Sequence, residues 1–242
     1  METTPLEIAL GILWFVVFVV STTFHEAAHG FAALRFGDTT AYEAGLVTLD
    51  PIPHMQRSII GMVIVPILTF AISISRGGSG WMIGWASTPY DPYWARANRR
   101  QAALMALAGP AANLILVIIA GLLIHLGMLL GIFTQPEAAN WTHTTAATSP
   151  GIAAGAAIVV SLLFSLNLIL LVFNLLPLPP LDGSEVVSLF LNDTTAERCR
   201  EFMAQPYASL IGLIVAWNLM GYILGPVQIL ALKLLYPGAG YH

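Results

Sequence analysis

Long stretches without a charged side chain are the feature of this sequence that most limits its fold. They are Ile8 to Phe24, Ser58 to Ser75, Gln101 to about Gly131, Ile152 to Leu176 and Tyr207 to Leu232. A helix needs about twenty apolar residues to cross the hydrocarbon core of a bilayer. Because backbone groups left unpaired in lipid are too costly, spanning segments of this kind are helical. We therefore expect an all-α polytopic membrane protein with about five to six transmembrane helices.

Composition indicates the same environment. Of the 242 residues, 57% are hydrophobic and only 9% are charged, whereas soluble domains carry about 25% charged residues. The formal net charge is -4, and the nine Lys and Arg residues form no dense basic cluster. This pattern excludes nucleic acid as a partner and makes the lipid bilayer the expected surroundings.

The basic residues predict how the chain is oriented, because Lys and Arg in short loops favour the cytoplasmic side. The loop from Phe133 to Pro150 contains neither and is expected outside, together with Arg76 and Lys233. The remaining basic residues are expected on the cytoplasmic side: Arg35, Arg57, Arg96, Arg99, Arg100, Arg198 and Arg200.

This orientation requires the chain to return through the membrane between Ser75 and Arg96. The intervening segment, GGSGWMIGWASTPYDPYW at residues 77–94, is rich in Gly, Pro and aromatic residues and is poor helix-forming material. We expect a re-entrant or short β-hairpin element there, packed against protein or lining a wet cavity.

The motif HEAAH, at His25 to His29, directly follows the first apolar stretch. Ionisable groups at the end of a membrane span are costly unless paired or bound to metal, so they are functional candidates. On a helix, His25 and His29 lie on one face and can reach one metal ion, while Glu26 lies close enough to act as a general base. Two histidines leave a tetrahedral metal site short of a third protein ligand.

Asp182 is the best-placed candidate for that ligand. It follows a proline-rich passage, Pro177 to Pro180, which cannot continue a helix and which must line a cavity or meet a partner beside the membrane. Alternatively, Asp182 caps the short helix that follows it.

Three motifs in this order resemble the site-2 protease family of intramembrane zinc metalloproteases: HEAAH, AGPAANL at Ala108 to Leu114, and FNLLPLPPLDG at Phe173 to Gly183. The stretches GDTTAYEAGLVTLDPIPHM and GWASTPYDP are similar to the compact branch of that family, without PDZ or CBS domains. In the second stretch Ser87, Thr88 and Tyr90 depart from the branch's usual GWAKPVPV pattern.

The resemblance implies a single metalloprotease domain over residues 1–242, with Zn²⁺ held by His25, His29 and Asp182 and with Glu26 as the general base. It implies regulated intramembrane proteolysis, in which peptide bonds in or near the transmembrane segments of single-pass membrane proteins are cut at an active site toward the cytoplasm. The oligomeric state does not follow from the sequence.

Three further polar residues are candidates for binding substrate or an oxyanion. The resemblance suggests Asn174 for this role, whereas Asn113 within a span could instead tie helices together. His54 could cover the metal or act as an electrophile, or it could be an ordinary loop histidine. The partly alternating stretch Tyr42 to Asp50 is a candidate strand for pairing with an unwound substrate, or a solvated connector.

Two other classes of membrane protein fit the sequence less well. A prenyl-protein-processing metalloprotease would supply a glutamate ligand from an E-x-x-x-D helix, but Glu197 and Glu201 have no Asp at that offset. A metal-binding protein or transporter without protease activity would spread polar ligands along several spans, and these spans are nearly free of them.

Overall fold

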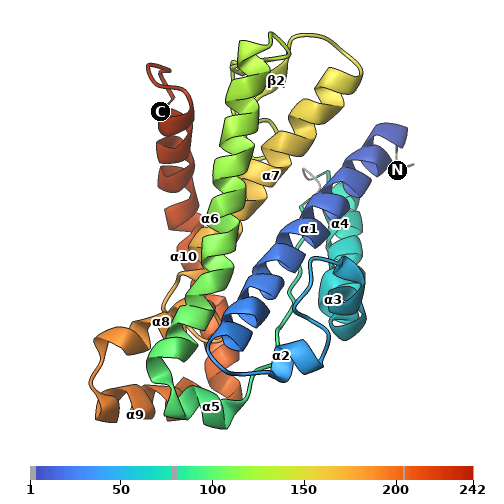
Figure 1. The fold of residues 1–242 in the computed structure, drawn as a ribbon. Coiled ribbons are helices and arrows are strands. Elements are labelled where there is room, and N and C mark those ends of the chain that lie inside the picture. The colour runs from blue at the N-terminus through green and yellow to red at the C-terminus, as the bar shows by residue number, and fades with distance from the viewer. Residues whose placement is uncertain (1–3, 78–80, 204, 242) are drawn as a thin grey trace.

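The computed structural model is built almost entirely of helices and describes residues 4–77, 81–203 and 205–241 (Figure 1). Within these residues, four helices are long and apolar enough to cross a membrane. They are α1 (Pro5–Arg35), α6 (Arg99–Leu129), α7 (Ile152–Asn174) and α10 (Pro206–Leu235). The structure therefore confirms the all-α polytopic membrane fold that the uncharged stretches predict.

The stretch expected as one crossing from Ser58 to Ser75 is helical from Ile60 to Ser75. It begins with a π-helical turn, η1 (Ile60–Ile64), and continues as α4 (Val65–Ser75). The preceding helix, α3 (Pro51–Arg57), meets this pair at a bend of 107°. If the bent pair is counted as one span, the described residues contain up to five.

After α4 the chain runs without regular secondary structure through residues 81–91, which we call the extended segment. The backbone N–H groups of Trp81, Ile83 and Trp85 donate to the Ser73 hydroxyl, the Thr69 hydroxyl and the Gly61 carbonyl. This alternation is typical of an extended chain. The segment thus lies along η1 and α4, in the region where a re-entrant element is expected; residues 78–80 of that region lie outside the described residues.

Glycine makes this contact possible. A Cβ atom added to Gly61 would overlap the carbonyl of Trp85, and one added to Gly84 would overlap the carbonyl of Gly61. The two backbones can therefore approach only because neither position carries a side chain.

The main packing unit is formed by α1, α6 and α7. Trp14 and Phe18 of α1 are buried against Met62 of η1 and Leu162 of α7. Many large side chains that point outward from the spans are apolar, such as Leu122 on α6. Apolar outer surfaces of this kind suit a lipid environment.

The short elements gather at the two ends of the bundle. The two-stranded antiparallel sheet of β1 (Phe133–Thr134) and β2 (Ala146–Ala147) lies at the end that carries the N-terminus (Figure 1). The other end carries the remaining short helices: α2 (Thr40–Glu43), α5 (Pro92–Ala97), α8 (Asp182–Val187), η2 (Ser188–Phe190) and α9 (Asp193–Met203). The regular strands thus lie away from the HEAAH motif, and the element beside that motif is the extended segment.

Candidate metal centre

The HEAAH motif lies within α1, toward its C-terminal end. Because a helix turns once in 3.6 residues, His25 and His29 project from the same face. Both side chains and that of Glu26 are buried. The Nε2 atoms of His25 and His29 lie 3.0 Å apart, with the two rings edge to face.

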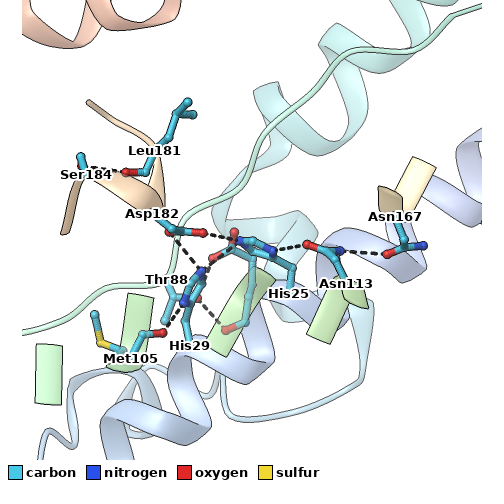
Figure 2. Close-up of polar contacts among 10 residues, drawn as sticks. His25, His29, Thr88, Met105, Asn113, Asn167, Leu181, Asp182 and Ser184 are labelled. Atoms are coloured by element: carbon cyan, nitrogen blue, oxygen red, sulfur yellow. Dashed lines mark hydrogen bonds and ion pairs between the residues drawn. The ribbon is translucent and has the colours of Figure 1, made fainter. Parts of the chain in front are cut away.

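The side chain of Asp182, which is distant in sequence, faces these two rings (Figure 2). Its Oδ2 lies 3.1 Å from His25 Nε2, and its Oδ1 lies 3.4 Å from His29 Nε2. The cap of α8 is Leu181, and the described structure gives α8 no side-chain cap hydrogen bond. The alternative role of Asp182 as a helix cap therefore has no support.

Two glycines from the recognised motifs allow this convergence. A Cβ atom on Gly109 of α6 would overlap the imidazoles of His25 and His29. A Cβ atom on Gly183 would overlap the carbonyls of Leu175 and Leu176, at the end of α7. The bare backbone at these two positions brings α6 against the histidines and holds the start of α8 close to α7.

The hydrogen bonds of the two rings determine which nitrogen faces the centre. His25 Nδ1 lies 2.6 Å from the side-chain oxygen of Asn113, and His29 Nδ1 lies 2.8 Å from the backbone carbonyl of Met105. Both partners accept hydrogen bonds, so each Nδ1 carries a hydrogen, and in the neutral rings each Nε2 presents a lone pair. Two lone pairs and a carboxylate would then face one another, and they repel unless positive charge lies between them.

The centre fits a zinc ion. A tetrahedral zinc with ligand distances of about 2.0–2.1 Å separates its ligand atoms by about 3.3–3.4 Å, close to the 3.0, 3.1 and 3.4 Å observed. Asp182 Oδ2 is also buried without a hydrogen-bond partner in the described structure. Among the described residues, His25, His29 and Asp182 are the group of His, Cys, Asp or Glu side chains that could hold a metal ion.

Glu26 is held by Thr88, one of the residues that depart from the family branch's usual pattern. The Thr88 hydroxyl, in the extended segment, lies 2.7 Å from Glu26 Oε2 and 2.9 Å from the Glu26 carbonyl oxygen. These bonds dock the extended segment directly against the candidate general base.

A cavity of about 480 Å³ contains the centre. Its walls come from α1, the extended segment, α6 and the proline-rich passage before α8, and they include Glu26, Thr88 and Asn174. Asn174 therefore lies where a substrate could reach it.

The other two polar candidates lie elsewhere. Asn113 is fully buried between His25 and Asn167 and does not line the cavity. His54 lies in α3, with Nε2 3.0 Å from the Thr48 carbonyl, and is also absent from the cavity walls. The candidate pairing strand, Tyr42 to Asp50, begins in α2 and continues as turns and bends.

Comparison with known proteins points to one family. The family model described as "Peptidase family M50" matches residues 13–219. The chain is 31% identical over 214 residues to "Putative zinc metalloprotease YwhC" of Bacillus subtilis, covering 88% of this chain and 84% of that protein. It is 31% identical over 226 residues to "Putative zinc metalloprotease Rip2" of Mycobacterium tuberculosis, covering 92% of this chain and 74% of that protein. No solved structure matches the chain.

Proposed function

Since the chain belongs to peptidase family M50, the site-2 protease family of zinc metalloproteases, we propose that it cuts membrane proteins in or near their transmembrane segments. The observation that carries this proposal is the location of the metal centre. Its histidines belong to a helix long and apolar enough to span a bilayer, and another such helix, α6, contributes to the cavity walls. A peptide bond cut there would lie within or beside lipid.

The proposed zinc ligands are His25, His29 and Asp182. When bound, zinc polarises a scissile carbonyl and lowers the pKa of a coordinated water toward about 7. Glu26 is the proposed general base: it removes the proton from the attacking water and delivers it to the leaving amine. Thr88 donates a hydrogen bond that keeps the Glu26 carboxylate turned toward the cavity. Asn174, at the end of α7, is the proposed contact for the substrate backbone.

A substrate helix must unwind before its peptide bond can be attacked, because helical hydrogen bonds enclose the backbone. The extended segment is the proposed receiver of the loosened strand. Its residues Ala86, Ser87 and Thr88 line the cavity, and its alternate N–H groups already pair with η1 and α4 on one side. The opposite edge can add a strand by β-augmentation.

The site is proposed to face the cytoplasm. The end of the bundle that carries α5 and α9 holds most of the Arg residues that predict the cytoplasmic side (Figure 1). The cavity walls reach that end, where Arg200 pairs with Glu185 and Glu197. Water from the cytoplasm would enter along these charged groups. Single-pass membrane proteins are the proposed substrates, and regulated intramembrane proteolysis is the proposed process.

The test is cleavage of tagged single-pass membrane proteins co-expressed with the wild-type chain or with Glu26→Gln. We expect the fragments to disappear with Glu26→Gln while the purified variant keeps its zinc, because glutamine cannot accept the proton. Glu137→Gln, at an exposed position on the opposite end, is the matched control and should cleave normally. Identical fragments from wild type and Glu26→Gln would contradict the proposal, whereas a transporter would keep metal flux in the variant.

A further inference from the structure

A chain of buried side-chain amides extends behind His25, on the side away from Asp182 (Figure 2). Asn113 of α6 accepts from His25 Nδ1 at 2.6 Å and donates to Asn167 Oδ1 at 2.8 Å. Asn167 of α7 donates in turn to the Ser21 hydroxyl and to the Leu163 carbonyl, each at 2.8 Å. Both asparagines are fully buried.

The direction of this chain is determined at its far end. A backbone carbonyl can only accept, so the amide nitrogen of Asn167 must face Leu163. The oxygen of Asn167 then faces Asn113 and accepts from its nitrogen. Asn113 is thereby left with its oxygen toward His25, which requires a hydrogen on Nδ1 and, in the neutral ring, leaves the lone pair on Nε2.

His29 provides a contrast within the same centre. Its Nδ1 lies 2.8 Å from the backbone carbonyl of Met105, which cannot turn around to become a donor. Asn113 can do so, because a side-chain amide exchanges its oxygen and nitrogen by a half turn. Only His25 therefore needs a second residue to keep its acceptor in place.

We propose that Asn113 and Asn167 form a relay that positions His25 for zinc, with Asn167 holding the Asn113 oxygen against His25 Nδ1. The proposal rests on the proposed role of His25 as a zinc ligand. Hydrogen-bond partners of metal-bound histidines orient the ring and fix its tautomer, and losing them weakens metal affinity about 10–100-fold. Neither asparagine lines the cavity, so both act through His25 and not on substrate.

A double-mutant cycle on zinc affinity tests the relay, using the full-length protein in detergent and competition with a chromophoric chelator. Asn167→Leu frees Asn113 to turn, and we expect zinc to bind about 10-fold more weakly. In the Asn113→Asp background both carboxylate oxygens can accept from His25, so no orienting partner is needed, and the second oxygen faces the Asn167 oxygen, which also accepts. There, Asn167→Leu removes this contact between two acceptors, and zinc should bind as tightly as in Asn113→Asp alone or more tightly. A loss caused by general disruption of the packing would instead persist in both backgrounds.

Asn218→Leu is the matched control. Asn218 on α10 makes the same contact with the carbonyl four residues earlier, at 2.8 Å, but it is exposed and remote from the metal centre. Zinc affinity should not change in this variant.

An equal loss from Asn167→Leu in both backgrounds, or no loss in either, would overturn the relay. If Asn167→Leu does not fold, Asn167→Ala replaces it in the same cycle, and the same two outcomes overturn the relay. His25→Ala separates the two levels of the argument. Full zinc binding in that variant would refute the ligand set itself, whereas lost zinc binding with an unaffected Asn167→Leu would refute only the relay.

Discussion

Adding one methyl group at Gly109 should disable the metal centre. In the structure, a Cβ atom at this position would lie 2.6 Å from Cε1 and Nε2 of His25 and would also overlap His29 Nε2. Ordinary contact begins at 3.4 Å, and His29 Nε2 would lie only 2.4 Å from the Cβ atom. The His29 ring must therefore withdraw by about 1.0 Å and the His25 ring by about 0.8 Å, or α6 must move away from α1. Overpacking of this size costs about 1–3 kcal/mol.

The effect on function should be larger than the effect on stability. A displacement of about 1 Å in a catalytic group can lower the rate about 100-fold. We therefore expect Gly109→Ala to fold, to bind zinc at least 10-fold more weakly, and to cleave a membrane substrate about 100-fold more slowly. Zinc affinity is measured by chelator competition, cleavage by fragment formation in detergent, and folding by thermal unfolding with a helical circular dichroism signal.

Gly221→Ala provides the control for replacing a helical glycine. A Cβ atom at Gly221 of α10 would meet nothing within 4 Å, so the substitution should raise stability by up to about 1 kcal/mol through backbone entropy and leave zinc binding unchanged. The reasoning is refuted if Gly109→Ala binds zinc and cleaves like wild type, because α6 would then not lie against the histidines.

The remaining predictions concern three other contacts. Thr88→Val should slow cleavage about 10-fold with zinc content unchanged, because Glu26 loses the donor at 2.7 Å; an unchanged rate would show that Thr88 does not orient it. Asp182→Ala should weaken zinc binding more than the loss of a hydrogen-bond partner of a ligand does, which is about 10–100-fold. The same chelator competition measures this. Burial raises the pKa of Asp38, but hydrogen bonds from Thr40 and from the Asp91 N–H outweigh this and lower it. Because its pKa is lower in the folded protein than the unfolded value of about 3.9, the Asp38 carboxylate should stabilise the fold above that pH, and this contribution should disappear as the pH falls through the lower folded value. The difference in thermal unfolding between wild type and Asp38→Ala should therefore narrow in acid, and a constant difference would contradict the assignment.

Helix geometry and lipid chemistry explain why much of this architecture could be predicted. An uncharged stretch such as Ile152 to Leu176 can only be a buried or membrane helix, and α7 occupies most of it. The spacing of His25 and His29 predicts one shared face wherever the helix lies. The proline-rich passage before Asp182 and the family resemblance both point to this residue, which lies 153 positions beyond His29, although no local pattern shows that it meets the rings.

Features that depend on tertiary contacts could not be predicted in the same way. The bend of 107° after α3 has no single residue as its signal, and it lies at the start of the crossing expected from Ser58 to Ser75. Thr88 appeared only as a departure from a family pattern, because its contact with Glu26 joins segments 62 residues apart. The contact of Asn167 with Asn113 could not be predicted from the apolar span around it, although a polar residue at that depth is itself a signal of a functional or packing role.

The central claim is that one zinc ion lies between α1 and the start of α8. An anomalous difference map at the zinc edge, from crystals of the zinc-loaded protein, tests it most directly. We predict one peak about 2.0–2.2 Å from Nε2 of His25, Nε2 of His29 and a carboxylate oxygen of Asp182. A map with its peak elsewhere, or with Asp182 outside bonding distance, would contradict the account.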